Sequence, residues 1–239
     1  MTTGLKIVHS GALLRVELSR EPGNEFTEEM CKELTSLLME PPQTARVLLL
    51  RSAGDAFCTG RDGSARGASG MRSMALALAE VNIAIVFSSL TVVVEVAGDA
   101  AGFGVGLVGL SDVAVASTAA TFRFPEVKAS LAPALVLTWL PYVVGRRQAF
   151  WMTATGRSFD AYEAQRLGLV NEVVEPEALR SRTDEVVQDI LATPGTVCPQ
   201  IKKDLLSSDW LQMREDSYAA VDRLALRSLV LADGHGGDG

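Results

Sequence analysis

The chain has 239 residues, 48% of them apolar and 21% charged, which is the composition of an ordinary globular protein. Its 22 Lys and Arg residues are outnumbered by 29 Asp and Glu residues and form no dense basic run, so we expect no nucleic-acid partner. The uncharged stretch of residues 81–94 is too short to span a bilayer, and the sequence opens without a signal-peptide pattern. We therefore expect no membrane association.

Residues 1–130 alternate short strand patterns with helical patterns. Residues 13–18 alternate apolar with charged side chains, as a half-exposed strand does. Thr27 is typical of a helix N-cap, and the helix that follows it is expected to end near Met39, before two prolines. The Gly/Ser-rich residues 63–70 predict a mobile loop. An α/β fold of stacked ββα units explains this alternation.

After residue 125 we expect helices in every segment, so the fold is α/β first and all-helical last. The carboxy-terminal helices carry apolar faces that need a partner surface, in this chain or in another subunit. The tail, residues 233–239, is expected to be disordered. The expected strands cover residues 13–18, 47–51, 91–97, 113–116 and 121–124, and the expected helices cover 28–39, 71–88, 126–129, 134–144, 146–154, 160–167, 176–192, 198–206 and 210–231.

Histidine and cysteine are scarce. His9 and His235 lie near the two ends of the chain, and Cys31, Cys58 and Cys198 are widely spaced. This distribution argues against a catalytic triad, a Cys–His pair, a zinc site and a disulfide framework. We therefore expect reduced thiols, a cytoplasmic protein and no bound metal.

A glycine motif invites a dinucleotide interpretation that its surroundings do not favour. Residues 104–109 match the pattern G-x-G-x-x-G, and Glu126 follows at about the distance of a ribose contact. The preceding strand pattern ends near Ala97, however, and the next begins at Val113. The motif requires a strand and a long helix directly on either side, so we expect no nicotinamide or flavin cofactor.

Two glycine-containing turns, residues 57–62 and 98–106, each follow a strand pattern. Such turns can aim backbone N–H groups at one point. Two donors that converge on a carbonyl oxygen form an oxyanion hole, in which each donor contributes about 3 kcal/mol. The alternative is that these glycines serve tight chain packing alone.

Glu126 is the candidate acid or base. It follows Pro125, which suits the first position of a helix, so the carboxylate falls in the first turn. There it either complements the helix dipole or, among apolar neighbours that raise its pKa, transfers protons.

Several of these segments occur in the order typical of one enzyme family. Over residues 5–206 the chain resembles the enoyl-CoA hydratase/isomerase, or crotonase, superfamily. The resemblance implies a crotonase-like spiral of ββα units over residues 1–190 and a C-terminal helical oligomerisation region over 191–232. It rests on residues 56–62, 96–112, 122–126, 131–133, 144–145, 149, 153–156 and 164–171, the last of which is similar to the family's A-x-x-x-G-L-V signature.

The resemblance also implies a chemistry. The substrate would be an acyl-CoA or acyl-carrier-protein thioester, with CoA or phosphopantetheine as part of the substrate and no other cofactor, and the protein would be a homotrimer or hexamer. The backbone N–H groups of Thr59 and Phe103 would hold the thioester oxygen as an enolate forms, and Glu126 would move the proton. The implied substrate-binding residues are Cys58, Gly60, Arg61, Asp62, Gly102, Gly104 and Leu131.

Two positions depart from the family pattern. Gly106 stands where hydratases usually have the first of two glutamates, and Phe103 stands where Gly is usual. The Phe103 ring either lines the acyl site or turns the donor away. Three functions stay open: a Δ3-Δ2 enoyl-CoA isomerase with a single glutamate, a methylglutaconyl-thioester hydratase or polyketide β-branching dehydratase, and a non-catalytic acyl-thioester-binding homologue. The second branch is most similar in pattern.

Other charged residues have two interpretations each. Arg61 and Arg66 either meet a phosphate of the CoA or phosphopantetheine group or are solvated. Lys202 and Lys203 either contact the CoA phosphate or lie on a solvated helix face. Glu95, in the middle of a strand pattern, is expected to pair with Arg15, Arg51 or Lys128 or to face solvent rather than to act as a second acid.

Overall fold

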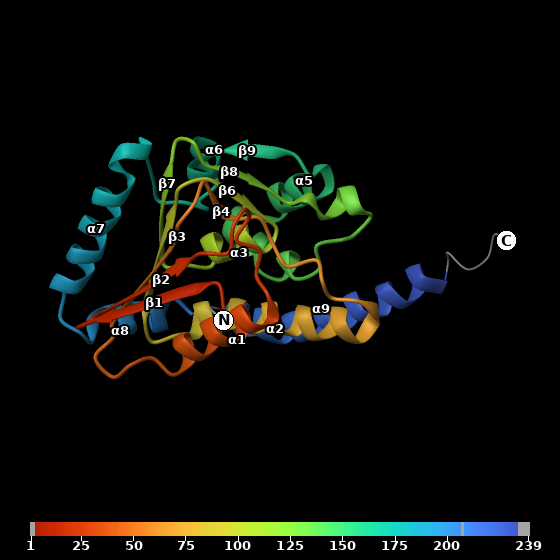
Figure 1. The fold of residues 1–239 in the computed structure, drawn as a ribbon, viewed down its shortest axis with the longest axis horizontal. Helices are drawn as coiled ribbons and strands as arrows, with labels where there is room; N and C mark the ends of the chain where they lie inside the picture. The colour runs from red at the N-terminus through yellow and green to blue at the C-terminus, as the bar shows by residue number, and fades with distance from the viewer. Residues whose placement is uncertain (1–2, 207, 234–239) are drawn as a thin grey trace.

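The computed structural model describes residues 3–206 and 208–233 of the chain (Figure 1). The strands lie at its centre, α7 packs on one side of them, and α2 and α9 run along the bottom of the view. In chain order the elements are β1 (Leu5–Ser10), β2 (Leu13–Leu18), α1 (Glu28–Met39), β3 (Val47–Ser52), β4 (Ala56–Cys58), α2 (Gly67–Phe87), β5 (Thr91–Val96), β6 (Asp99–Ala101), α3 (Phe103–Gly109), β7 (Val113–Ser117), β8 (Thr121–Arg123), the short 3-10 helices η1 (Pro125–Ala129) and η2 (Val136–Thr138), α4 (Leu140–Val144), α5 (Arg146–Thr155), β9 (Ser158–Asp160), α6 (Ala161–Arg166), β10 (Glu172–Val174), α7 (Pro176–Ala192), α8 (Val197–Leu205) and α9 (Ser208–Asp233).

The central strands of the larger sheet are buried on both faces. Its strand order is β1-β2-β3-β5-β7-β10, and all neighbours are parallel except the β1–β2 hairpin. In β3, Leu48 and Leu50 point into the main core, whereas Leu49 packs in a second cluster with Val187 of α7. A strand covered on both faces reads as a continuous apolar run, which is the pattern of residues 47–50.

The smaller sheet has the order β4-β6-β8-β9, with β9 antiparallel to β8. Successive units β3-β4-α2 and β5-β6-α3 each give one strand to the larger sheet and one to the smaller, followed by a helix. The strands β7 and β8 repeat the step. This spiral confirms the predicted ββα units, and it brings the carboxyl ends of β4, β6 and β8 to one place.

Helix α2 is a core helix. By length and composition it could cross a bilayer, but 61% of its most apolar window is buried inside the protein. It packs between α1 and α9 (Figure 1). On α9, Met213 and Val221 are buried in this chain whereas Leu226 is 62% exposed, so this chain covers part of the apolar face of α9.

The sequence placed most helices correctly and missed short strands. The cap of α1 is confirmed, since the Thr27 side chain accepts a hydrogen bond from the Met30 N–H. The expectation of an all-helical second half is wrong, because β9 and β10 add to the two sheets. The strands β4, β6, β9 and β10 have three residues each, too few to show an alternating pattern. Helix α2 begins at Gly67, inside the segment expected to be a loop. Residues 234–239 of the predicted tail lie outside the described residues, and Asp233 ends α9.

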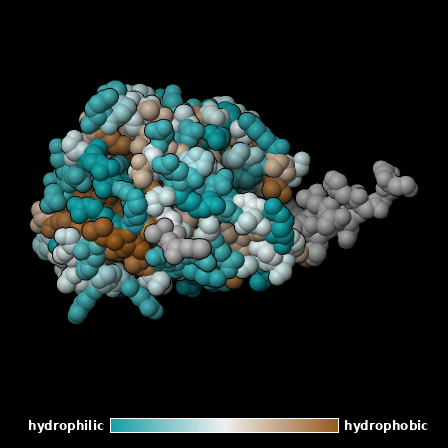
Figure 2. Space-filling view, viewed as in Figure 1, coloured by the Kyte–Doolittle hydropathy of each residue, from teal (hydrophilic) through white to brown (hydrophobic). Residues whose placement is uncertain are grey.

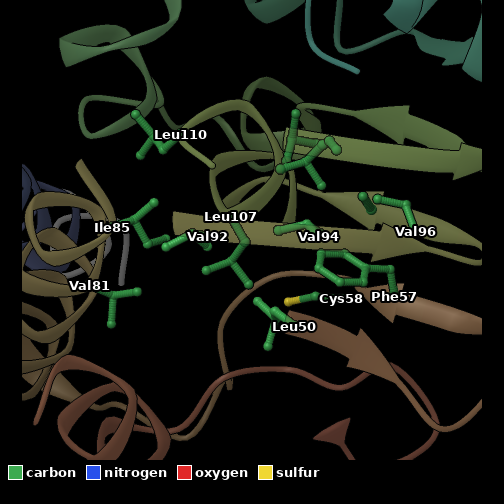
Figure 3. Close-up of a cluster of buried hydrophobic side chains, with 14 of the residues drawn as sticks. Leu50, Phe57, Cys58, Val81, Ile85, Val92, Val94, Val96, Leu107 and Leu110 are labelled. Atoms are coloured by element: carbon green, nitrogen blue, oxygen red, sulfur yellow. The ribbon is translucent and has the colours of Figure 1, made fainter. Parts of the chain in front are cut away.

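The main core lies between the larger sheet and α2. Figure 3 shows Cys58 and Leu107 pointing into one apolar cluster with Val94 and Ile85. On the surface, polar side chains dominate the face drawn in Figure 2, except for an apolar area over the β1–β2 end. The core thus fixes β4 and α3 against each other, and the turns at their ends form the wall of a cavity.

Candidate active site

A cavity of about 640 Å³ opens where β4, β6 and β8 end. Four regions form its wall: the turn after β4, the first turn of α3, η1 with the loop that follows it, and the inner face of α2. Leu224 of α9 also contributes. Most lining side chains are apolar, and the charged ones are Arg61, Arg66 and Glu126. A mainly apolar cavity with a few polar groups is typical of a small-molecule site.

Glu126 reaches this cavity from the first turn of η1, directly after Pro125. Its Oε2 atom is buried and has no hydrogen-bond partner among the described residues. Burial raises the pKa of the carboxyl above its ordinary value, and a backbone hydrogen bond and the charge of Arg61 offset part of that rise. A carboxyl group with a raised pKa is suited to proton transfer near neutral pH.

Gly102 makes room for this carboxylate. A β-carbon at position 102 would lie 2.8 Å from Glu126 Oε1. The backbone φ of Gly102 is +52°, in the region that L side chains rarely adopt. The glycine is therefore required both by the backbone and by the carboxylate beside it.

Phe103 begins α3, so its backbone N–H has no acceptor within the helix. It lines the cavity next to Gly102. Its ring packs edge-on against Phe26, with the ring centroids 5.1 Å apart. The Phe103 side chain, which replaces the glycine usual in the family, thus packs on the buried Phe26 ring. Its backbone N–H remains at the start of α3.

The prediction that Thr59 provides the other donor is wrong. The Thr59 N–H donates to the Gly23 carbonyl oxygen at 2.8 Å, so it is already engaged. Phe26 and Arg61 form an isolated parallel β-bridge, in which the Phe26 N–H donates to Gly60 O and the Asp62 N–H donates to Phe26 O. This pairing does not use the N–H of Arg61 itself. Arg61, on the cavity wall, is therefore the candidate donor from this turn.

The other predicted binding residues divide into two groups. The cavity is lined by Gly60, Arg61, Gly102 and Leu131. Three predicted residues support the wall from behind and do not line it: Cys58, Asp62 and Gly104.

Each of these three has a structural role. Cys58 is fully buried, its thiol lies 3.5 Å from Gly60 O, and burial raises its pKa to about 12. Asp62 forms an ion pair with Arg20 at 2.5 Å, and hydrogen bonds from Ser64 lower its pKa. Gly104 packs against the Cys58 carbonyl, because a β-carbon there would lie 2.0 Å from that oxygen.

Asn82 of α2 is a cavity residue that the sequence analysis did not single out. It is 2% exposed, and its Oδ1 atom has no hydrogen-bond partner in the part of the chain that the structure describes. A β-carbon on Gly106 would be 3.5 Å from this oxygen and 3.7 Å from the Trp139 ring. The sequence signal that could have identified Asn82 is its polar side chain in the middle of a long apolar helix.

Two charged residues prove to be structural. The Lys202 side chain is 12% exposed and donates to Asp112, to Ile85 O and to Leu90 O, so it neither contacts the cavity nor lies on a solvated face. Glu95 is 3.6 Å from Arg180, and burial raises its pKa. Glu95 therefore forms an ion pair, as expected, but its partner is Arg180 and not one of the three predicted cations.

The fold and cavity define a crotonase-like α/β protein. A model of the enoyl-CoA hydratase/isomerase family matches residues 9–228, and the chain belongs to this family of enzymes. The structure of an enoyl-CoA hydratase from Mycobacterium avium subsp. paratuberculosis K-10 is similar with a TM-score of 0.86 and 22% identity, over 95% of this chain and 94% of that one.

Similar proteins carry names of more than one activity. The 1,2-epoxyphenylacetyl-CoA isomerase of Escherichia coli K12 is 29% identical over 223 residues, which cover 88% of this chain and 85% of that protein. Enoyl-CoA hydratase AKT6-1 of Alternaria alternata is 29% identical over 82% of this chain. The match covers 66% of AKT6-1, just under two thirds of that protein. A probable enoyl-CoA hydratase of Rhodobacter capsulatus is 34% identical over 69% of this chain and 66% of that protein.

Proposed function

We propose that the protein adds or removes water, or shifts a double bond, at the β-carbon of an acyl thioester through an enolate. The observation that carries the proposal is the Glu126 carboxyl, which has a buried, unpartnered oxygen and a raised pKa in a mainly apolar cavity. A single proton carrier is consistent with the glycine at position 106.

In this mechanism the backbone N–H groups of Arg61 and Phe103 hold the thioester oxygen. Glu126 removes a proton from the α-carbon, and the electron pair of the broken C–H bond moves to the carbonyl oxygen as the enolate. In dehydration the enolate expels the β-hydroxyl group, which takes the proton from Glu126 and leaves as water. In isomerisation of a β,γ-enoyl thioester, Glu126 returns the proton to the γ-carbon. Both routes balance with one carboxyl group.

The thioester would arrive on CoA or on the phosphopantetheine of a carrier protein, and this chain's residues would carry the proton chemistry. Arg61 and Arg66 lie on the cavity wall, and Arg66 is exposed. Guanidinium groups bind phosphate, which both carriers contain, so these two residues are the proposed phosphate contacts. Within the proposal, the methylglutaconyl-thioester hydratase or β-branching dehydratase branch is preferred, and the Δ3-Δ2 isomerase is the alternative.

The test is the exchange of the α-proton for solvent deuterium, followed by mass spectrometry of the thioester. We expect Glu126→Gln to bind acetoacetyl-CoA within a few-fold of wild type and to lose at least about a hundred-fold in turnover. Glu95→Gln is the matched control, because Glu95 is also buried with a raised pKa but lies outside the cavity. Full turnover in Glu126→Gln would reject the proposal. A wild-type protein that binds acyl-CoA without exchange would instead be the non-catalytic homologue.

The proposal includes a homotrimer or hexamer. Apolar side chains are exposed on the η2–α5 region, among them Leu137, Tyr142 and Phe150, the last of which is 68% exposed. Exposed apolar side chains in one region of the chain favour a subunit contact. Light scattering would give a mass of three or six times 25.4 kDa, and a monomer at micromolar concentration would reject this part of the proposal.

A further inference from the structure

Asn82 is a polar residue in an otherwise apolar wall. It lies in the middle of α2, and its cavity-lining neighbour one turn earlier on the same helix is the buried Leu78. No hydrogen bond within the described residues occupies the Oδ1 atom of its carboxamide. A buried acceptor without a partner is unfavourable, and a ligand that donates a hydrogen bond to it removes that disadvantage.

The Asn82 carboxamide and the Glu126 carboxylate both lie next to glycines at the start of α3. Gly102 caps α3, and the Gly106 N–H donates to the Gly102 carbonyl at 3.3 Å, so the two glycines are one helical turn apart. A β-carbon on Gly102 would meet Glu126 Oε1 at 2.8 Å, and one on Gly106 would meet Asn82 Oδ1 at 3.5 Å. One turn of helix is about 5 Å long. Glu126 and Asn82 therefore approach α3 at two glycines that are one helical turn apart.

Packing alone does not account for Asn82. The other buried residues of this wall that line the cavity, Leu78 and Trp139, are apolar, so packing against them requires no polar group. The carboxamide contributes an acceptor, Oδ1, that the described part of the chain leaves unused, and a donor, Nδ2. Because both Gly106 and Asn82 line the cavity, an acyl chain in it comes within reach of the carboxamide.

We propose that the Asn82 carboxamide binds a hydroxyl group on the β-carbon of the acyl chain, so that the ligand class of the site is a 3-hydroxyacyl thioester. The inference rests on the proposed function and deepens it. A hydroxyl group can donate to Oδ1 and accept from Nδ2, which satisfies both halves of the amide. Asn82 would then hold the departing hydroxyl while Glu126 acts on the α-carbon, which favours dehydration or hydration over a double-bond shift.

The experiment compares two ligands that differ by one oxygen. Calorimetry would measure the affinity of butyryl-CoA and of each enantiomer of 3-hydroxybutyryl-CoA for the Glu126→Gln protein, in which the hydroxy ligand is not consumed. We expect one 3-hydroxybutyryl enantiomer to bind about 10-fold more tightly than butyryl-CoA, since a site built to pair with a hydroxyl discriminates against its absence. Adding Asn82→Leu should abolish that difference and leave butyryl-CoA within about 3-fold.

Controls separate this inference from the proposed function. Leu78→Met changes the same face of α2 without a polar group, so it should keep the 10-fold preference. If Asn82→Leu does not fold, as judged by circular dichroism, Asn82→Ala replaces it, and the comparison of ligands on the protein with Asn82 intact needs no variant at that position. Equal binding of all ligands there would overturn the inference while thioester binding still supports the proposed function. Binding of neither thioester would reject both.

Discussion

Glu126 Oε1 occupies the space directly beside the Gly102 backbone, 2.8 Å from where a β-carbon would stand. This contact ties the proposed proton carrier, Glu126, to the start of α3, where the Phe103 N–H lies. A methyl group at position 102 cannot share that space with the carboxylate. The carboxylate, as the end of a flexible side chain, would have to move.

The first prediction therefore concerns Gly102→Ala. We expect turnover to fall by at least about 10-fold, because a displaced carboxylate no longer faces the α-carbon, and stability to fall by about 1 kcal/mol from the positive φ. Gly11→Ala is the control, since Gly11 also has a positive φ, of +60°, but nothing within 4 Å of its β-carbon. It should lose similar stability and keep its turnover. Equal turnover in both variants, measured beside thermal unfolding, would contradict the role of this contact.

The second prediction follows from the raised pKa of Glu126. A carboxyl whose pKa is higher in the folded than in the unfolded state contributes stability below its unfolded value of 4.5, and that contribution is lost as the pH rises through the folded pKa. Glu126→Gln should thus be more stable than wild type at pH 7 to 8, and the difference should vanish below about pH 4.5. Urea unfolding at several pH values measures it.

Glu28→Gln provides the opposite sign in the same assay. The Glu28 pKa is lowered by the hydrogen bond from Lys32, so its contribution exists at neutral pH and is lost on acidification. This variant should be less stable than wild type at pH 7 and equal to it in acid. If both variants changed stability in the same direction at pH 7, the burial of Glu126 would not be the cause.

The third prediction concerns the buried pair of Glu95 and Arg180. The Glu95 side chain is 4% exposed, whereas that of Arg180 is 57% exposed. Arg180→Ala removes the ion pair of a buried carboxylate and leaves it only the charge of Arg51, so it should cost about 1 kcal/mol at pH 7, less than the loss of a fully buried pair because Arg180 is partly solvated. Glu95→Gln removes the buried charge and should cost less. A larger loss for Glu95→Gln, in denaturant unfolding at pH 7, would show that the charge itself stabilises the sheet.

The sequence predicted the parts of the site that depend on local patterns. Pro125 marks the start of a helical turn, and the apolar residues around it imply a carboxyl group with a raised pKa at Glu126, whose burial in the structure acts in that direction. The ββα units follow from buried strands such as residues 47–50 that alternate with helices. These features need no information from distant parts of the chain.

The features that the sequence missed depend on distant contacts. The prediction of Thr59 as an oxyanion donor was wrong because its N–H donates to the carbonyl oxygen of Gly23, which is 36 residues away in the chain. Asn82 became a cavity residue because the fold brings α2 against Gly106 of α3. Apolar periodicity is a local pattern. It does not predict which distant carbonyl accepts a hydrogen bond from a loop N–H, or which helix lines a cavity.

The last prediction compares two glycines of α3. A β-carbon at Gly104 would lie 2.0 Å from the carbonyl oxygen of Cys58, which is backbone and cannot move without separating α3 from β4. At Gly106 the nearest atoms, Asn82 Oδ1 and Trp139 Cζ2, lie at ordinary contact distances of 3.5 and 3.7 Å. Gly104→Ala should therefore destabilise the protein by about 3 kcal/mol or more, whereas Gly106→Ala should be neutral or gain up to about 1 kcal/mol from helix propensity.

Thermal unfolding of the two variants measures this difference. Both are Gly→Ala substitutions in α3, so the two variants differ only in the contact that the new methyl group makes. Gly104→Ala should also weaken binding of acetoacetyl-CoA, since the turn after β4 and the start of α3 carry the two proposed oxyanion donors, and their spacing is set by this contact. Gly106→Ala keeps that spacing and should bind within about 3-fold of wild type. If Gly104→Ala proved as stable as Gly106→Ala and bound the thioester equally well, the close contact of α3 with Cys58 would not position the site.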